Sequence, residues 1–243
     1  MSELLFVPSV IKTFTSYATK LTDENTRLRE SKKAIYFNIE QGCFDKLVIV
    51  DGSNIDILSE EEIEEIESRG IQVEQMKFQQ SVEDVQKFGK SYGEMLITNY
   101  MIKNSKLVNE FGSFVKISGR YNFDNASDVI PKIASLSTFF LNDHPFILRN
   151  YYPFTSTIMY KTSVEFFNEH LADCGSECSK DITGFLESIF FRRLHVLKRR
   201  SVSVPYPRFS GLSGVTAGPI IHQHLQKRRI LSSLGFLGFT CDH

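Results

Sequence analysis

An arginine and an aspartate occupy polar turns that directly follow two apolar, strand-like runs. Arg120 lies in the turn of "FVKISGRYNF" (114–123), and Asp51 lies in the turn of "KLVIVDGSN" (46–54). Arginine carries a permanent, planar cation that suits phosphate or carboxylate, and the Asp51 carboxylate can accept hydrogen bonds from a base or a ribose. Each turn also has an ordinary structural explanation, because these residue types form tight turns. The presence of both residues favours a ligand site.

Small and polar neighbours accompany the arginine and the aspartate. Gly52 and Gly119 permit close approach of a ligand to the backbone, and Ser53 and Asn54 offer hydrogen-bonding groups. We therefore take these four neighbours as candidate binding residues.

The two turns are predicted to meet at one edge of a sheet. Over the first 125 residues strand-like and helix-like segments alternate, which is typical of an α/β fold with a mostly parallel central sheet flanked by helices. The carboxyl ends of parallel strands lie on one edge, where ligands bind in a crevice. The expected strands are 4–11, 46–54, 71–78 and the start of 114–123, and the expected helices are 22–42, 59–68 and 91–105.

The second half of the chain, from residue 126 onward, has a less regular pattern. No internal repeat or linker divides it from the first half, so the sequence predicts one domain over residues 1–243. The expected elements are a short helix at 126–136, strands at 137–143 and 156–162, helices at 163–175 and 179–197, and an extended segment at 201–211.

Composition narrows the class of protein. The chain has 243 residues, of which 42% are hydrophobic, so it can bury a substantial core. A formal net charge of -1 argues against a general nucleic-acid-binding protein. Cys174 and Cys178 form a C-x3-C pair with no second pair to complete a zinc site. The start, "MSELLFVPSV", does not resemble a secretory signal, and no apolar run reaches the ~18 residues of a spanning helix, so we expect a cytoplasmic protein.

The order and spacing of "VIVDGSN", "GKSYGEMLITNYMIKNS" and "FVKISGRY" resemble bacterial glycosyltransferases of capsule and lipopolysaccharide assembly with a GT-A-like fold. The similarity is strongest over residues 46–125. It implies a nucleotide-binding half (1–125) and an acceptor half with a C-terminal tail (126–243). In such enzymes the Asp-Gly-Ser-type turn holds the nucleotide base, and the following helix approaches the diphosphate. The implied partners are a nucleotide sugar and a glycan or lipid-linked glycan acceptor.

The chain departs from this family where the third motif ends. The family's metal-binding Asp-x-Asp is replaced here by Ser118, Gly119 and Arg120. A fixed cation can stabilise the leaving phosphate as a metal does, so we expect a metal-independent enzyme in which Arg120 acts with Lys90 and Lys116 as helpers. A donor with a single phosphate, such as a CMP-sugar, would also relieve the need for metal. The alternative role for Lys116 is that of an edge or snorkelling lysine.

The resemblance also implies a carboxylate base on a helix of the acceptor half. Glu187 in "LESIFFRRL" is the candidate, because a base must reach the attacking hydroxyl. The alternative is a surface carboxylate paired with nearby Arg192. Asp181 is a second candidate, with helix capping as its alternative role.

Two later segments extend this hypothesis. The Gly- and Ser-rich stretch at 207–218 is expected to close over donor or acceptor. The basic and apolar tail at 226–239 is expected to rest on the inner face of the cytoplasmic membrane, to pack as a C-terminal helix on the core, or to dock the rest of a larger polymerase.

The function predicted from the sequence is therefore transfer of a sugar from a nucleotide-sugar donor to a surface polysaccharide. The two rivals are a nucleotidyl- or phosphosugar transferase and a non-catalytic assembly module of a polysaccharide-synthesis complex.

Overall fold

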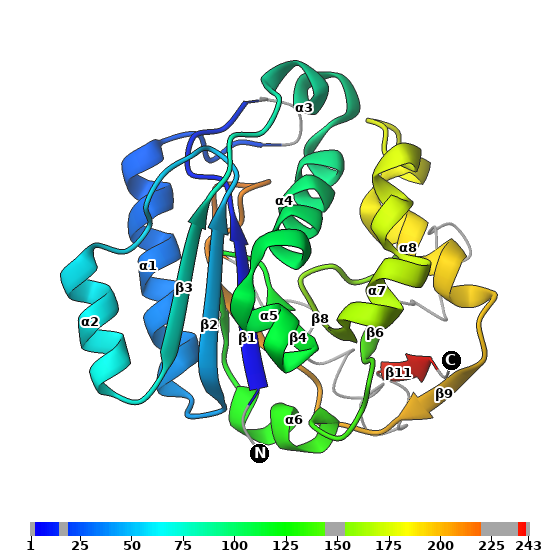
Figure 1. Ribbon diagram of the computed structural model, residues 1–243. Helices are drawn as coiled ribbons and strands as arrows, with labels where there is room; N and C mark the ends of the chain where they lie inside the picture. Colours follow the sequence, from blue (N-terminus) through cyan, green and yellow to red (C-terminus); the bar gives the residue numbers. More distant parts are fainter. Residues whose placement is uncertain (1–2, 15–18, 144–153, 220–237, 242–243) are drawn as a thin grey trace.

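A five-stranded sheet with the strand order β3-β2-β1-β4-β8 forms the centre of the fold (Figure 1). The computed structural model describes residues 3–14, 19–143, 154–219 and 238–241. β1 to β4 run parallel, and β8 pairs with β4 in the antiparallel direction. This confirms the predicted α/β class and the mostly parallel sheet. The strands are β1 (Glu3–Ser9), β2 (Phe44–Asp51), β3 (Gln72–Lys77), β4 (Ser113–Ile117) and β8 (Met159–Ser163).

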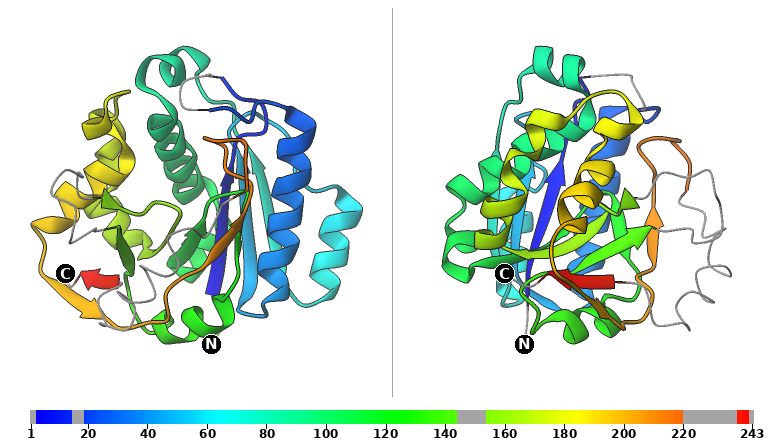
Figure 2. Two further views of the ribbon diagram at one scale, coloured as in Figure 1. Left: turned by 180° about the vertical axis from the view of Figure 1, so that it is seen from behind. Right: turned by 90° about the vertical axis from the view of Figure 1, so that its right-hand side faces the viewer.

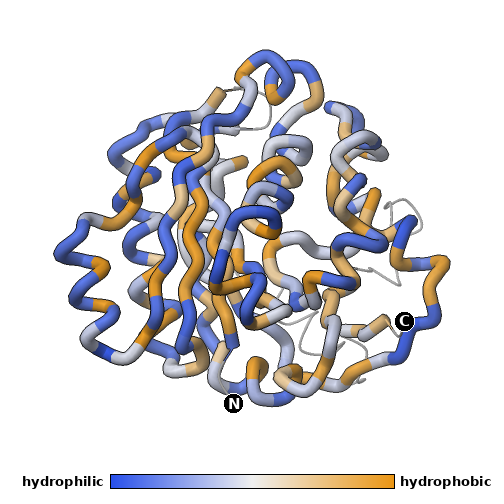
Figure 3. The backbone as a smooth tube through the Cα atoms, in the orientation of Figure 1, coloured by the Kyte–Doolittle hydropathy of each residue, from blue (hydrophilic) through white to orange (hydrophobic). Residues whose placement is uncertain are grey.

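Both faces of the sheet are buried, which explains the continuous apolar runs of its strands. Leu4 and Phe6 face one core, which they share with α4 (Lys90–Asn104). Leu5 and Val7 face the other core, against α1 (Glu24–Glu40). Figure 2 shows α1 and α4 on opposite sides of the sheet, and Figure 3 shows largely hydrophobic strands between more hydrophilic outer helices.

The helices begin where side chains satisfy their first free N–H groups. Asp23 accepts a hydrogen bond from the Thr26 amide at 2.7 Å, and Ser59 forms a capping box with Glu62 at the start of α2 (Glu60–Ser68). The helices predicted near these caps and over 91–105 are confirmed. Two short helices were not predicted, α3 (Val82–Phe88) and α5 (Lys106–Phe111), although each has a serine at its N-cap.

The order of the strands creates a crevice beside β1. The chain first builds outward from β1 through β2 to β3 and then returns past β1, by way of α3, α4 and α5, to form β4. The helix between β1 and β2 lies on one face of the sheet and α4, on the way from β3 to β4, lies on the other, so the strand order reverses beside β1. Such a topological switch point is where open α/β sheets bind ligands.

The second half adds an edge strand and two small sheets. One of these has the order β7-β6-β11-β9, and the other pairs β10 with β5. Pro131 lies inside α6 without ending it, and the helix expected at 163–175 divides into α7 and a 3-10 helix, η1. The bounds are β5 (Tyr121–Phe123), α6 (Ala126–Ile133), β6 (Phe140–Asp143), β7 (Phe154–Thr155), α7 (Val164–His170), η1 (Ala172–Glu177), β9 (Arg199–Val202), β10 (Phe209–Gly211) and β11 (Gly238–Cys241).

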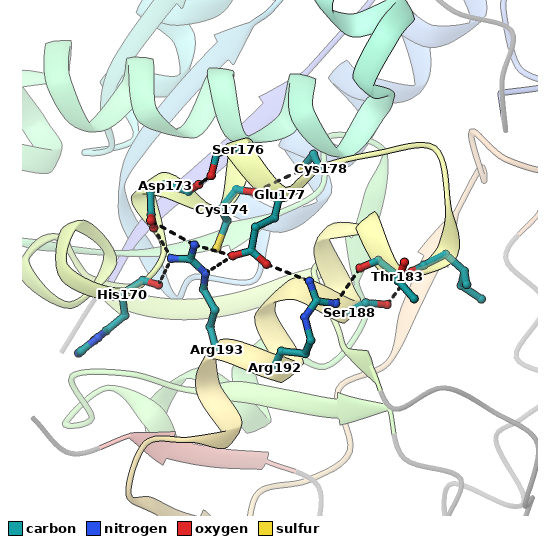
Figure 4. Close-up of polar contacts among 11 residues, drawn as sticks. His170, Asp173, Cys174, Ser176, Glu177, Cys178, Thr183, Ser188, Arg192 and Arg193 are labelled. Carbon is teal, nitrogen blue, oxygen red and sulfur yellow. Dashed lines mark hydrogen bonds and ion pairs between the residues drawn. The ribbon is translucent and has the colours of Figure 1, made fainter.

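The helix expected at 179–197 is interrupted, and only its second part is an α-helix, α8 (Leu186–His195), preceded by a 3-10 turn, η2 (Ile182–Gly184). Ion pairs hold α8 to η1 (Figure 4). Arg193 pairs with Asp173 and Glu177, and Arg192 pairs with Glu177 at 2.9 Å. The Arg193 hydrogen bond lowers the pKa of Asp173. Because η1 packs against α4, these ion pairs also position α8 relative to α4.

Candidate functional site

A cleft of about 220 Å³ lies at the carboxyl ends of β1 and β4, beside the topological switch point of the sheet. Its lining comes from segments that are far apart in the sequence: the end of β1, the turn after β4, the first turns of α1, α4 and α8, and the loop that follows β10. The lining includes Ser9, Arg27, Lys90, Glu94, Ser118, Gly119, Arg120, Tyr121, Glu187 and Gly214.

Arg120 lies in this cleft, as the sequence predicts. Its guanidinium is partly buried, and burial lowers its pKa from the ordinary value. Within the described part of the chain, no carboxylate forms an ion pair with Arg120, and its buried Nε has no hydrogen-bond partner. Because a desolvated cation is costly without a counter-charge, Arg120 is suited to an anionic ligand.

A second arginine, Arg27, lies beside Arg120 and was missed from the sequence. It is 5% exposed, and its Nε donates to the Val10 carbonyl at 2.8 Å while Nη1 donates to the Leu21 carbonyl at 2.9 Å. Burial and the neighbouring charge of Arg120 lower the pKa of Arg27 to about 9, which leaves it protonated at neutral pH. One sequence signal exists, because Arg27 shares the buried stripe of α1 with Ile35.

The first turn of α4 adds to the positive side of the cleft. Its N-cap is Gly89, which has a left-handed φ of 92° and, because it lacks a side chain, does not cap the first N–H groups of the helix. The first N–H groups of a helix carry partial positive charge and attract anions. Lys90 is the first residue of α4 and is exposed at the cleft.

The turn at 51–54 does not line the cleft. The Asp51 carboxylate is 1% exposed and accepts four hydrogen bonds, from the amides of Ile11, Ser53 and Ile55 and from the Ser53 hydroxyl. Burial raises its pKa. The alternative explanation of Asp51 as a turn-forming residue therefore agrees with its contacts, and its oxygens are occupied by the protein.

The three neighbours of Asp51 also stabilise the loop. The Ser53 hydroxyl accepts from the Lys12 amide at 2.9 Å. A Cβ on Gly52 would lie 2.7 Å from the Gln80 side chain, so this glycine allows protein packing rather than ligand approach. Asn54 is exposed, with a φ of 63° that this residue type tolerates. The structure thus places the whole turn outside the lining of the cleft.

Lys116 is fully buried and is not part of the lining of the cleft, contrary to the helper role expected from the sequence. Its ammonium pairs with Glu94, donates to the Ser118 hydroxyl at 2.9 Å and donates to the Thr157 carbonyl.

Gly119 does line the cleft, but a Cβ there would lie 2.7 Å from the Pro8 carbonyl oxygen. Gly119 is therefore required for the close packing of the turn on β1.

Glu187 faces the cleft from α8. One of its oxygens accepts a hydrogen bond from the Thr157 hydroxyl at 2.9 Å, and Arg192 pairs with Glu177 instead. The alternative of a Glu187–Arg192 surface pair is therefore wrong.

Glu94 is a second carboxylate in the cleft and was missed, because its partner Lys116 is 22 residues away in sequence. Asp181 is exposed at the start of η2 and makes no capping hydrogen bond.

The loop after β10 lies over the two arginines. The carbonyl oxygen of Gly214 accepts hydrogen bonds from the amides of Lys20 and Leu21 at 3.0 and 3.2 Å. A Cβ on Gly214 would lie 2.6 Å from Nη2 of Arg120. The loop expected at 207–218 is thus beside the cleft, and its glycine leaves room for the guanidinium.

Other features of the described residues add no further site. Cys174 and Cys178 are buried, and burial raises the pKa of each thiol to about 12. Among the residues described, no group of three or more His, Cys, Asp or Glu is arranged to hold a metal ion, and no described helix has the length and apolarity to cross a bilayer. Most of the tail at 226–239 lies outside the described residues.

Comparison with known proteins finds only distant structural similarity. No protein-family model and no curated protein sequence matches the chain. The backbone is similar to 4-diphosphocytidyl-2C-methyl-D-erythritol synthase from Anaerococcus prevotii DSM 20548, with 9% identity and a TM-score of 0.41 over 79% of this chain and 83% of that one. It is similar to HddC from Yersinia pseudotuberculosis complexed with GMP-PN, with 10% identity and a TM-score of 0.37 over 69% and 80%. The bifunctional glycosyltransferase WbbM has 10% identity and a TM-score of 0.41, over 79% of this chain and 38% of its own.

The contacts of Asp51 generate a prediction about stability. Replacement of Asp51 by Ala leaves several buried donors without an acceptor, so we expect the free energy of unfolding to fall by about 2–4 kcal/mol. Asp56→Ala is the matched control, because Asp56 is exposed and its contacts with Lys77 and Gln75 lie at the surface. Urea unfolding monitored by circular dichroism provides the measurement. Equal stability of the two variants would show that Asp51 is not a structural residue.

Proposed function

We propose that this chain is a glycosyltransferase that takes a sugar from a nucleotide-sugar donor and adds it to a surface-polysaccharide acceptor. One observation carries the proposal: two guanidinium groups, of Arg120 and Arg27, are desolvated together at the strand-end cleft, and no carboxylate pairs with Arg120 in the described chain. A phosphate group supplies the missing negative charge and fits the planar fork of arginine.

Arg120 acts on the bond that breaks. In sugar transfer, the bond between the anomeric carbon and the phosphate oxygen is cleaved, and its electron pair remains on the leaving nucleotide. A fixed donor aimed at that oxygen stabilises the developing charge. Lys90 and the first N–H groups of α4 line the same cleft and increase the positive potential there.

Glu187 is the proposed base. It lies on α8, across the cleft from the arginine-bearing segments, and its Thr157 contact holds one carboxylate oxygen in place. The acceptor hydroxyl attacks the anomeric carbon, and Glu187 removes its proton as the new bond forms.

A thermal-shift screen of nucleotides and nucleotide sugars tests the proposal. Ligand bound to the native state raises the unfolding midpoint, so we expect a rise for the parent protein that is lost in Arg120→Ala. Arg29→Ala is the control, because the Arg29 side chain is 71% exposed. If every nucleotide and nucleotide sugar fails to bind at millimolar concentration, the non-catalytic assembly module becomes the better account.

Turnover of the same variants distinguishes charge from geometry. Arg120→Ala should lose roughly 2–4 kcal/mol of transition-state stabilisation, the amount typical of one preorganised donor, mainly as a lower kcat. Arg120→Lys keeps the charge but not the planar fork, so it should restore only part of the rate. A folded Arg120→Ala enzyme with the parent rate would reduce Arg120 to a turn residue.

Chelation tests whether the arginines replace a metal. Because Arg120 occupies the place of the family's Asp-x-Asp, we expect transfer to survive excess EDTA. The initial rate is measured with and without chelator and after addition of Mn²⁺ or Mg²⁺. Complete loss in EDTA and recovery with metal would contradict the proposal and direct attention to Asp124 and Asp128 as carboxylate ligands.

Substitution of Gly214 tests the position of the guanidinium. In Gly214→Ala the new methyl group displaces the end of the Arg120 side chain, while the backbone conformation is retained. Nucleotide affinity should therefore fall about three- to tenfold, which corresponds to ~1 kcal/mol, with little change in the melting temperature. Gly218→Ala in the same loop is the control, since a Cβ there would meet only the Thr216 hydroxyl at 3.8 Å. Identical affinity of the two variants would place the anion away from Arg120.

A further inference from the structure

The wall of the cleft formed by α4 and α8 carries two carboxylates in a shared hydrogen-bond network. Glu94 comes from α4, and Glu187 comes from α8; Figure 1 shows these helices on the same side of the sheet. Lys116 pairs with Glu94 and also donates to the Thr157 carbonyl, and the Thr157 hydroxyl donates to Glu187. Lys116 and Thr157 therefore fix the two carboxylates relative to each other.

The protein uses only one oxygen of each carboxylate. Lys116 bonds Oε1 of Glu94, and Thr157 bonds Oε1 of Glu187. Within the described residues, no hydrogen bond reaches the second oxygen of either group. The three protons of the Lys116 ammonium are all donated within the protein, so Lys116 has none left for a ligand. The wall consequently offers acceptors and no buried cation to an entering molecule.

Ser9 is an independent sign that a ligand completes this cleft. It is the last residue of β1, it is 4% exposed and it lines the cleft. Its hydroxyl has no hydrogen-bond partner in the described chain. A buried polar group of this kind loses free energy unless a partner is supplied. A ligand hydroxyl beside Ser9 supplies both a donor and an acceptor.

The two walls of the cleft have opposite preferences. Arg27 belongs to the α1 side of the sheet, and the Arg120 guanidinium lies beside it. Glu94 and Glu187 belong to the side covered by α4 and α8. A phosphate is attracted to the two arginines and to the first turn of α4, and it is repelled by the carboxylates of Glu94 and Glu187. Neutral hydroxyl groups satisfy carboxylate acceptors, which bind only donors.

We propose that Glu94 and Ser9, from the two sides of β1, form a subsite for the hydroxyl groups of a sugar whose phosphate lies on Arg120, beside Glu187, which holds the attacking hydroxyl of the acceptor. The identity of that ligand as a nucleotide sugar rests on the proposed function. Lys116 and Thr157 are positioning residues, because they act through the two carboxylates. Glu187 binds the attacking hydroxyl in its role as base, and Glu94 binds hydroxyls of the transferred sugar.

Binding of each nucleotide with and without its sugar distinguishes the contribution of the carboxylates from that of the arginines. Dissociation constants are measured by calorimetry for UDP and UDP-glucose, GDP and GDP-mannose, and CMP and CMP-sialic acid. In at least one pair the parent protein should bind the sugar-bearing member about tenfold more tightly. Glu94→Gln should remove most of that preference and leave affinity for the bare nucleotide within about twofold. Glu110→Gln, an exposed change on α5, should alter neither.

Two conservative variants, Glu94→Gln and Thr157→Val, are chosen because they are expected to fold. Glu94→Gln retains an oxygen that can accept from Lys116, and Thr157→Val removes the hydroxyl that holds Glu187 without touching an ion pair. Thr157→Val should lower turnover while nucleotide affinity is maintained. Equal binding of bare and sugar-bearing nucleotides by the parent protein would overturn this subsite and leave the phosphate site intact. Failure of all six ligands to bind would overturn the subsite together with the proposed function.

Discussion

The surrounding contacts depend on one constraint, which is the positive charge of two arginines buried at the strand-end cleft. Within the described chain, no carboxylate forms an ion pair with Arg120. Burial of a guanidinium costs free energy unless its charge and its N–H groups are matched. Arg27 has its N–H groups matched by carbonyl oxygens at Val10 and Leu21, but these carry no formal charge. The segment that supplies Leu21 in turn holds Gly214 against Arg120. Three distant parts of the chain thus converge on two guanidinium groups, and of these Arg120 has no carboxylate partner among the described residues.

The topology of the sheet explains why the cleft has a cationic and an acidic wall. Alternate side chains of one strand face opposite cores, so α1 and α4 deliver their residues from opposite sides of β1. Because the strand order is β3-β2-β1-β4, the cleft between these two sides lies at the carboxyl ends of β1 and β4. Arg27 and Glu94 are brought to one cavity by this arrangement, although neither contacts the other. Lys116, which comes from β4 within the sheet, forms an ion pair with Glu94.

Local patterns were sufficient to predict the scaffold but only part of the site. Apolar runs and capping residues such as Asp23 and Ser59 act over a few neighbours, so the main strands and helices of the first half were found. The position of Arg120 at the cleft could be predicted because it requires only that the end of one strand be recognised in the sequence. Lys116 and Asp51 were assigned to a ligand because the sequence does not show which buried groups meet across the sheet. Arg27 and Glu94 were missed for the same reason: their roles depend on Arg120 and Lys116, which are remote in sequence.

A crystal structure of the protein with a bound nucleoside diphosphate tests the central claim most directly. The account predicts phosphate oxygens within hydrogen-bond distance of the Arg120 guanidinium, at the carboxyl ends of β1 and β4, with the first turn of α4 directed at the same group. Binding of the diphosphate at another surface, with Arg120 left without an anion, would contradict it.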